Sequence, residues 1–247
     1  SGPTLENVWL SGNTASTDGG GIHCFSQSTP LLKNTRIVGN SSLNEGGGIW
    51  CSQNSTVSFD TADRSTIYLN MSLTGNDLYS DNYMMVVVDT FTVMYPKNYH
   101  ASPLNNFDFD ILSGLYPQVN ADLYVSPEGD NANSGLTPDD PLTTIHFATS
   151  VIAEDSLNMY NIHLANVIYS PSTNGEFFPL FIPEYVSVEG GEMEETILDA
   201  EGISRVIAFS YTNEAAVKNL TIKGGENSGG FGGGIYMEYS SASFTTI

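Results

Sequence analysis

The stretch PTLENVWLSGNTASTDGGGIHC at residues 3–24 recurs with the same spacing as PLLKNTRIVGNSSLNEGGGIWC at residues 30–51. The offset of 27 residues places Ile22 over Ile49. Each copy contains short pieces of strand length, separated by Gly, Asn and Ser, and shows no helical period. A unit this short cannot bury its own apolar face. Stacking of successive copies at about 4.8 Å is therefore expected, and this predicts a β-solenoid.

A partial third copy lies near the C-terminus, as VKNLTIKG at residues 217–224 and GGGIYM at residues 232–237. The glycine triplets predict sharp corners, where positive φ is needed and a side chain would clash. Asn7, Asn34 and Asn219 occupy equivalent positions in the three copies. We expect them to form an interior ladder in which each side-chain amide bonds its neighbours along the axis.

These repeats resemble those of the right-handed parallel β-helix proteins of the pectin-lyase-like superfamily. A second stretch, DLYVSPEGD at residues 122–130 followed by NSGLTPDDPLTTI at residues 133–145, is similar to the opening segment of DUF1565-type β-helix proteins, which are typically secreted by bacteria. The resemblance implies an all-β parallel β-helix. It also implies one short helix near residues 143–154 that caps an end of the solenoid.

The order of these pieces predicts three regions. Residues 1–59 would be the terminal coils of one β-helix module, and residues 120–247 the capping segment and first coils of the next. Residues 60–119 read as irregular coils or a β-rich connector, with a small separate β-domain as the alternative. Both ends of the sequence fall inside a coil, so we expect a window from a longer tandem array.

The charge balance excludes several classes of protein. The chain has 28 acidic against 7 basic residues and a net charge of −21, which disfavours binding to nucleic acid. No apolar run approaches the roughly 20 residues needed to span a bilayer. Since 40% of the residues are hydrophobic, the chain can bury a core and should fold.

Strand alternation after each Gly-Gly-Gly-Ile corner predicts which side chains face outward. The outward positions form an aromatic column, which we expect to stack on sugar rings, to bind a partner subunit or to be covered by loops: His23, Trp50 and Tyr236. The inward positions are Cys24, Cys51 and Met237. The two cysteines form either a buried thiol ladder or a disulfide.

The turn at Asp130, with Asp139 and Asp140 nearby, is a candidate calcium site, and a plain capping turn is the alternative. We expect no other cofactor. The sequence contains no catalytic constellation that we can assign, because its few Lys and Arg residues sit in no acidic nest. His146 and His163 are interpreted as structural.

These observations favour a non-enzymatic structural or adhesive protein, extracellular or at the cell surface, in which tandem β-helix modules form a rigid rod or filament. Its expected partners are copies of itself placed end to end, covalently or not. Polysaccharide is the other candidate partner. The alternative function is a polysaccharide-binding or polysaccharide-degrading β-helix protein, so an enzyme remains open.

Overall fold

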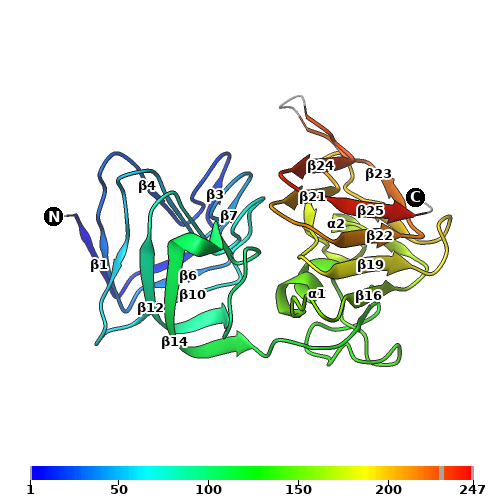
Figure 1. The fold of residues 1–247 in the computed structure, drawn as a ribbon, viewed down its shortest axis with the longest axis horizontal. Helices are drawn as coiled ribbons and strands as arrows, with labels where there is room; N and C mark the ends of the chain where they lie inside the picture. Colours follow the sequence, from blue (N-terminus) through cyan, green and yellow to red (C-terminus); the bar gives the residue numbers. More distant parts are fainter. Residues whose placement is uncertain (1, 228–230, 246–247) are drawn as a thin grey trace. The chain divides into compact units, whose positions relative to one another are not determined.

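The computed structural model describes residues 2–227 and 231–245, which form two compact units with their boundary between Gln118 and Val119. In both units most strands are short, and the strands pair in parallel and stack turn upon turn (Figure 1). The structure confirms the predicted fold class, an all-β parallel β-helix.

Unit 1 is the part up to Gln118, and three parallel ladders run through its described residues. The first contains β1 (Thr4–Glu6), β5 (Leu31–Lys33) and β9 (Ser58–Phe59). The second contains β2 (Trp9–Ser11), β6 (Arg36–Val38), β10 (Ser65–Tyr68), β12 (Met84–Val93) and β14 (Phe107–Tyr116). The third contains β4 (Ile22–Cys24), β8 (Ile49–Cys51), β11 (Leu78–Ser80) and β13 (Ala101–Ser102). A short pair, β3 (Thr14–Ala15) with β7 (Ser41–Ser42), and a 3₁₀ turn, η1 (Leu104–Asn106), complete the unit.

The register of the first two turns follows the sequence repeat. Leu5 pairs with Leu32 and Ile22 with Ile49, as the alignment of the two copies predicts. The ladders then continue beyond residue 59, because β10 pairs with β6 and β12 pairs with β10. Residues 60–118 thus extend the solenoid of unit 1.

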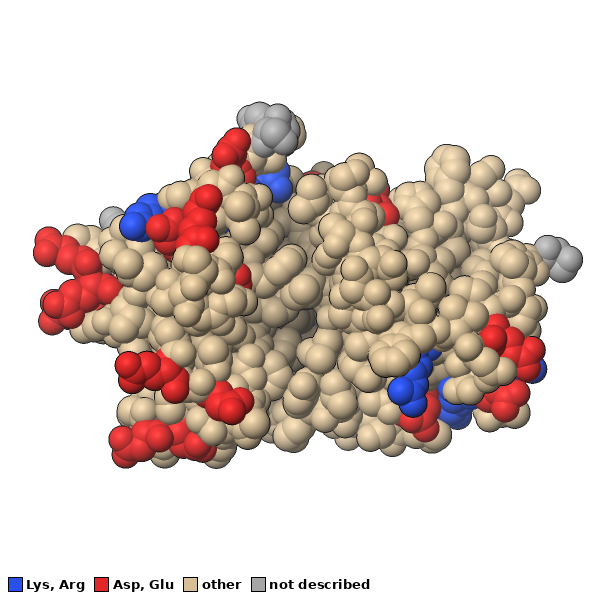
Figure 2. All heavy atoms as spheres, turned by 180° about the vertical axis from the view of Figure 1, so that it is seen from behind, with Lys and Arg blue, Asp and Glu red and all other residues tan. Residues whose placement is uncertain are grey.

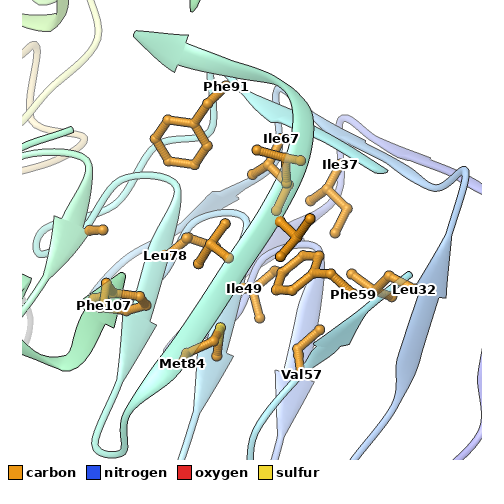
Figure 3. Close-up of a cluster of buried hydrophobic side chains, with 14 of the residues drawn as sticks. Leu32, Ile37, Ile49, Val57, Phe59, Ile67, Leu78, Met84, Phe91 and Phe107 are labelled. Atoms are coloured by element: carbon orange, nitrogen blue, oxygen red, sulfur yellow. The ribbon is translucent and has the colours of Figure 1, made fainter. Parts of the chain in front are cut away.

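The core of unit 1 is a column of apolar side chains inside the turns (Figure 3). Leu32, Ile37 and Ile49 have no exposed surface, and Ile67 and Leu78 fill the equivalent positions one turn further on. The first turn stacks against a neighbouring turn on one side only. Its residues Leu5, Leu10 and Ile22 are partly buried against this core.

Unit 2 begins at Val119 and repeats the arrangement. Its longest ladder contains β15 (Leu123–Val125), β16 (Tyr160–Leu164), β19 (Val186–Gly190), β22 (Ala215–Lys218) and β25 (Ala242–Thr245). A second contains β17 (Ile168–Tyr169), β20 (Ile197–Asp199) and β23 (Thr221–Lys223). A third contains β18 (Leu180–Phe181), β21 (Ile207–Ser210) and β24 (Ile235–Glu238).

The helix expected near residues 143–154 is α1 (Ile145–Val151), which packs against β15, β16 and β18 in unit 2. A single helical turn that the sequence did not predict, α2 (Pro171–Asn174), follows β17. Pro171 at its first position and Gly175 in the left-handed region after it account for its start and stop.

A polar ladder crosses the turns of unit 1 and is buried except at Asn13, its first member. The Asn13 side-chain amide donates to Oδ1 of Asn40 (2.8 Å), and the Asn40 amide donates to Oδ1 of Asn70 (3.0 Å). Asn70 in turn donates to Oδ1 of Asp77 (2.9 Å), and Thr92 donates to Oδ2 of the same carboxylate (2.6 Å). This is a ladder of the expected kind, but it is formed by a different set of asparagines.

The asparagines assigned to an interior ladder lie elsewhere. Asn34 donates to Oδ1 of Asn7 (2.7 Å), but both side chains are exposed, in turns where φ is positive. Asn219 lies in unit 2 and is 3.4 Å from Oε1 of Glu189. The interior placement was wrong, because these residues occupy left-handed turn positions outside the strands, where Asn is favoured.

Candidate functional site

The third ladder of unit 1 carries a column of outward-facing rings. His23, Trp50 and Tyr79 are in register on β4, β8 and β11. The His23 and Trp50 rings stack with their centroids 4.3 Å apart and their planes at 22°. The sequence predicted the first two members but missed Tyr79, because no glycine triplet precedes Leu78.

Three carboxylates flank this column. Asp18 and Glu45 each precede a glycine triplet, one turn apart. The indole nitrogen of Trp50 donates to Oε2 of Glu45 (2.8 Å), and Asp81 lies 3.5 Å from the Tyr79 hydroxyl. Burial raises the pKa of Glu45, and the neighbouring Asp18 raises it further, whereas the bond from Trp50 acts in the opposite direction. We define this set of six side chains as the acidic aromatic column: Asp18, His23, Glu45, Trp50, Tyr79 and Asp81.

Tyr236, the third ring expected in the column, belongs to unit 2 and lies on β24. The Arg205 guanidinium lies 4.5 Å from the centre of its ring. Met237 was expected inside but is 40% exposed, because it sits on the last described turn and nothing covers it there. The equivalent residue one turn earlier, Phe209, has no exposed surface. The glycine repeat therefore predicted correctly that Tyr236 lies in a strand after a glycine corner. It was wrong to place Tyr236 in one column with His23 and Trp50, which belong to unit 1.

Cys24 and Cys51 are buried, in register and free, so of the two alternatives the structure has the thiol ladder. Hydrogen bonding to Cys24, together with burial, raises the pKa of the Cys51 thiol. The Cys51 thiol is therefore not prepared as a nucleophile, whereas its hydrogen bond lowers the pKa of the buried Cys24 thiol.

In unit 2 the outer face of β16 carries a carboxylate–imidazole pair. Nε2 of His163 lies 3.2 Å from Oδ2 of Asp122, and the His163 ring stacks on Tyr124 with centroids 4.9 Å apart. Burial raises the pKa of Asp122, but hydrogen bonds from Asn161 and His163 outweigh it and the net pKa is lowered. The third group bonded to this pair is the amide of Asn161, which is not a nucleophile, so the pair orders the face of the sheet without forming a triad.

Two separate side-chain acceptors cap the N-terminus of α1. Thr144 accepts from the backbone N–H of Phe147, and the carboxylate of Glu176 accepts from those of Ile145 (2.8 Å) and His146 (2.9 Å). Together they satisfy donors that a helix N-terminus otherwise leaves open. Glu176 is 3% exposed, and burial raises its pKa to about 7.

Residues 127–235, which begin just after β15 and end at the first residue of β24, match the model of a family described as a protein of unknown function, DUF1565. This part of the chain is similar to the DUF1565 family. The match covers α1, its Glu176 cap and the strands of unit 2 from β16 to β23. It confirms the resemblance stated from the motif at residues 122–145.

The DUF1565 segment contains the three carboxylates considered for calcium. Oδ1 of Asp130 accepts from the backbone of Ala132, and Oδ2 of Asp140 accepts from the backbone and hydroxyl of Ser134. Asp139 is exposed. Across residues 2–227 and 231–245, no group of three or more His, Cys, Asp or Glu side chains could hold a metal ion. The structure therefore gives Asp130 and Asp140 the role of turn caps and does not gather the three carboxylates.

In unit 1, residues 10–24 match the repeat of the Chlamydia polymorphic membrane protein. This match spans β2, β3 and β4 and includes the first glycine triplet and His23. No curated protein and no solved structure matches the chain. In the part of the chain that the structure describes, no helix has the length and apolar character needed to cross a membrane.

Replacing Glu176 by Gln in the DUF1565 segment should change how its stability depends on pH. The folded pKa of about 7 lies above the ordinary value of 4.5, so the contribution of Glu176 is greatest at low pH and is lost as the pH rises through this window. As the pH rises from 4.5 to 8, the free energy of unfolding of E176Q should increase by roughly 3 kcal/mol relative to that of the wild type. Denaturant unfolding of both proteins at several pH values measures this, and parallel curves would contradict it.

Proposed function

We propose that this chain is part of a non-enzymatic, adhesin-like protein of the cell surface, in which β-helix modules form a rod. The match of residues 10–24 to a repeat of a Chlamydia polymorphic membrane protein carries the proposal. The fold supports it, because stacked parallel turns extend in one direction without limit and resist bending.

The surface composition is consistent with this role. In Figure 2 most of the visible surface is uncharged, with acidic side chains in separate groups and few basic ones. A net charge of −21 keeps extended particles apart in solution. Few cations are available to act as a base or to hold an acidic substrate, which favours a structural role over turnover.

Turns at the ends of the described ladders support axial association. Met237 is 40% exposed where its equivalent one turn earlier is buried, and Leu5 is only partly buried where Leu32 is fully buried. A further β-helix turn would cover these positions. We propose that modules, or separate copies of the chain, meet through these surfaces and continue the solenoid.

Electron microscopy of the purified chain at increasing concentration tests this association. We expect short rods that lengthen by axial stacking, because in-register strands add to open parallel edges. Met237→Lys should reduce the rods to single particles, since it places a charge on the stacking surface. The matched control is Met159→Lys in unit 2, where Met159 is 45% exposed outside the strands. Compact, monodisperse wild-type particles would contradict the proposal.

A further inference from the structure

The acidic aromatic column has the composition of a surface that recognises cations. Its rings lie in register along β4, β8 and β11, so the column follows the solenoid axis. Successive positions on it are about 4.8 Å apart. Asp18 and Glu45 border the rings on the side of the glycine corner, and Asp81 borders them beyond the end of β11.

Within the part of the chain that the structure describes, these carboxylates have no counter-ion. The ion pairs there use Lys33, Arg64, His163 and Lys223, and none involves Asp18, Glu45 or Asp81. Glu45 and Asp81 each contact a ring of the column through a carboxylate oxygen, and the backbone carbonyl oxygen of Asp18 lies 3.2 Å from Nδ1 of His23. The result is a strip of negative charge and aromatic carbon, half-buried except at His23 and Asp81, and its charge is not balanced by a neighbouring cation.

The ring geometry decides against a sugar as the preferred occupant. Saccharides stack on the faces of aromatic rings, but His23 and Trp50 cover faces of each other at 4.3 Å. Because these two rings stack along the solenoid axis, they present mainly their edges outward, beside the carboxylate oxygens. A guanidinium or ammonium group can pair with the carboxylates while its aliphatic stem lies along the ring edges.

We propose that the acidic aromatic column is a docking surface for a basic polypeptide segment, in which Arg or Lys side chains reach Glu45 and Asp81. Charge complementarity identifies the partner, because a chain of −21 attracts a cationic segment and this strip gives it a place to bind. This docking role rests on the proposed function of the chain at the cell surface. The binding itself does not require rod formation.

A short oligoarginine peptide is the probe, added to the full chain in a Trp9→Phe background. Trp50 is then the only tryptophan, since the protein has two. We expect saturable binding that shifts Trp50 fluorescence and weakens with salt. The double variant E45Q/D81N should lose about fivefold or more in affinity, because it removes both carboxylates and Glu45 is half-buried, where a charge pair is worth more than at an exposed position.

The matched control is E192Q/E194Q, which removes the same charge from exposed positions in unit 2. We expect this control to change the affinity by less than about twofold. Gln at position 45 can still accept the Trp50 bond, and circular dichroism checks that both variants fold. Equal losses in the two double variants, an unchanged Trp50 signal, or a neutral oligosaccharide that displaces the peptide from Trp50 would each overturn the proposal. Failure here leaves rod formation intact, so the two proposals are distinguishable by electron microscopy.

Discussion

Replacing Gly47 by Ala should destabilise unit 1 by about 3 kcal/mol or more, which lowers its midpoint of thermal unfolding by roughly 10 °C. A Cβ at Gly47 would lie 2.2 Å from the carbonyl oxygen of Met71 and 2.5 Å from its carbonyl carbon and nitrogen. All three contacts are backbone atoms of the next turn. No side chain can rotate away, so the two turns must separate.

Gly39→Asn is the control for this effect. Gly39 has φ of +63°, and a Cβ at this position would meet nothing within 4 Å. Asn accepts the left-handed conformation, so G39N should unfold close to the wild-type temperature. Thermal circular dichroism of both variants makes the comparison. A G47A protein as stable as G39N would show that the spacing of the turns is not set by the glycine corner.

Replacing Asp77 by Ala should cost unit 1 roughly 3–5 kcal/mol, because three buried donors lose their acceptor. Those donors are the backbone and side-chain N–H groups of Asn70 and the hydroxyl of Thr92. Asp77 is 1% exposed, and all three of these donors are neutral groups. Urea unfolding at neutral pH measures the loss, with the exposed Asp108 replaced by Ala as the control.

Asp77→Asn separates the hydrogen bonds from the charge. Burial raises the pKa of Asp77 to about 6 from its ordinary 3.8, so its contribution to stability is greatest at low pH and falls as the pH rises through that window. D77N keeps an acceptor for Asn70 and carries no charge. It should therefore gain about 3 kcal/mol relative to the wild type between pH 3.8 and 8. A pH-independent difference would show that burial does not raise the pKa of Asp77.

The strands and register of the first two turns could be predicted because their repeat has a constant length. The pairing of Ile22 with Ile49 follows directly from the offset. The next turn breaks the pattern, since Gly75-Asn76-Asp77 replaces the glycine triplet. Gly75 still has φ of +63°, and a Cβ there would meet the oxygen of Leu78 at 2.2 Å. The chain still makes the same corner at this turn, although the glycine triplet that identifies the corner in the sequence is absent.

Long-range partners account for the features that could not be predicted. Glu176 caps a helix that begins at Ile145, and the intervening residues give no sign of that return. Asp77 stands where the preceding turn has Gly48, so the repeat gives no sign that a side chain there joins the ladder. Tyr236 was placed in the column of Trp50 because the local motif is the same, yet the two residues belong to separate units. Local motifs identify a position within a turn but not the stack to which the turn belongs.

The polarity of the buried asparagine ladder also bears on how such a protein changes length during evolution. Asn40 accepts a hydrogen bond from Asn13 and donates one to Asn70. Each interior member of the ladder thus offers an oxygen to one neighbour and an N–H to the other. A duplication of the turn that contains it would insert one more such link and leave both flanking hydrogen bonds intact. Gain or loss of whole turns is therefore the readily tolerated mutation in this architecture, whereas insertion of part of a turn would break the ladder.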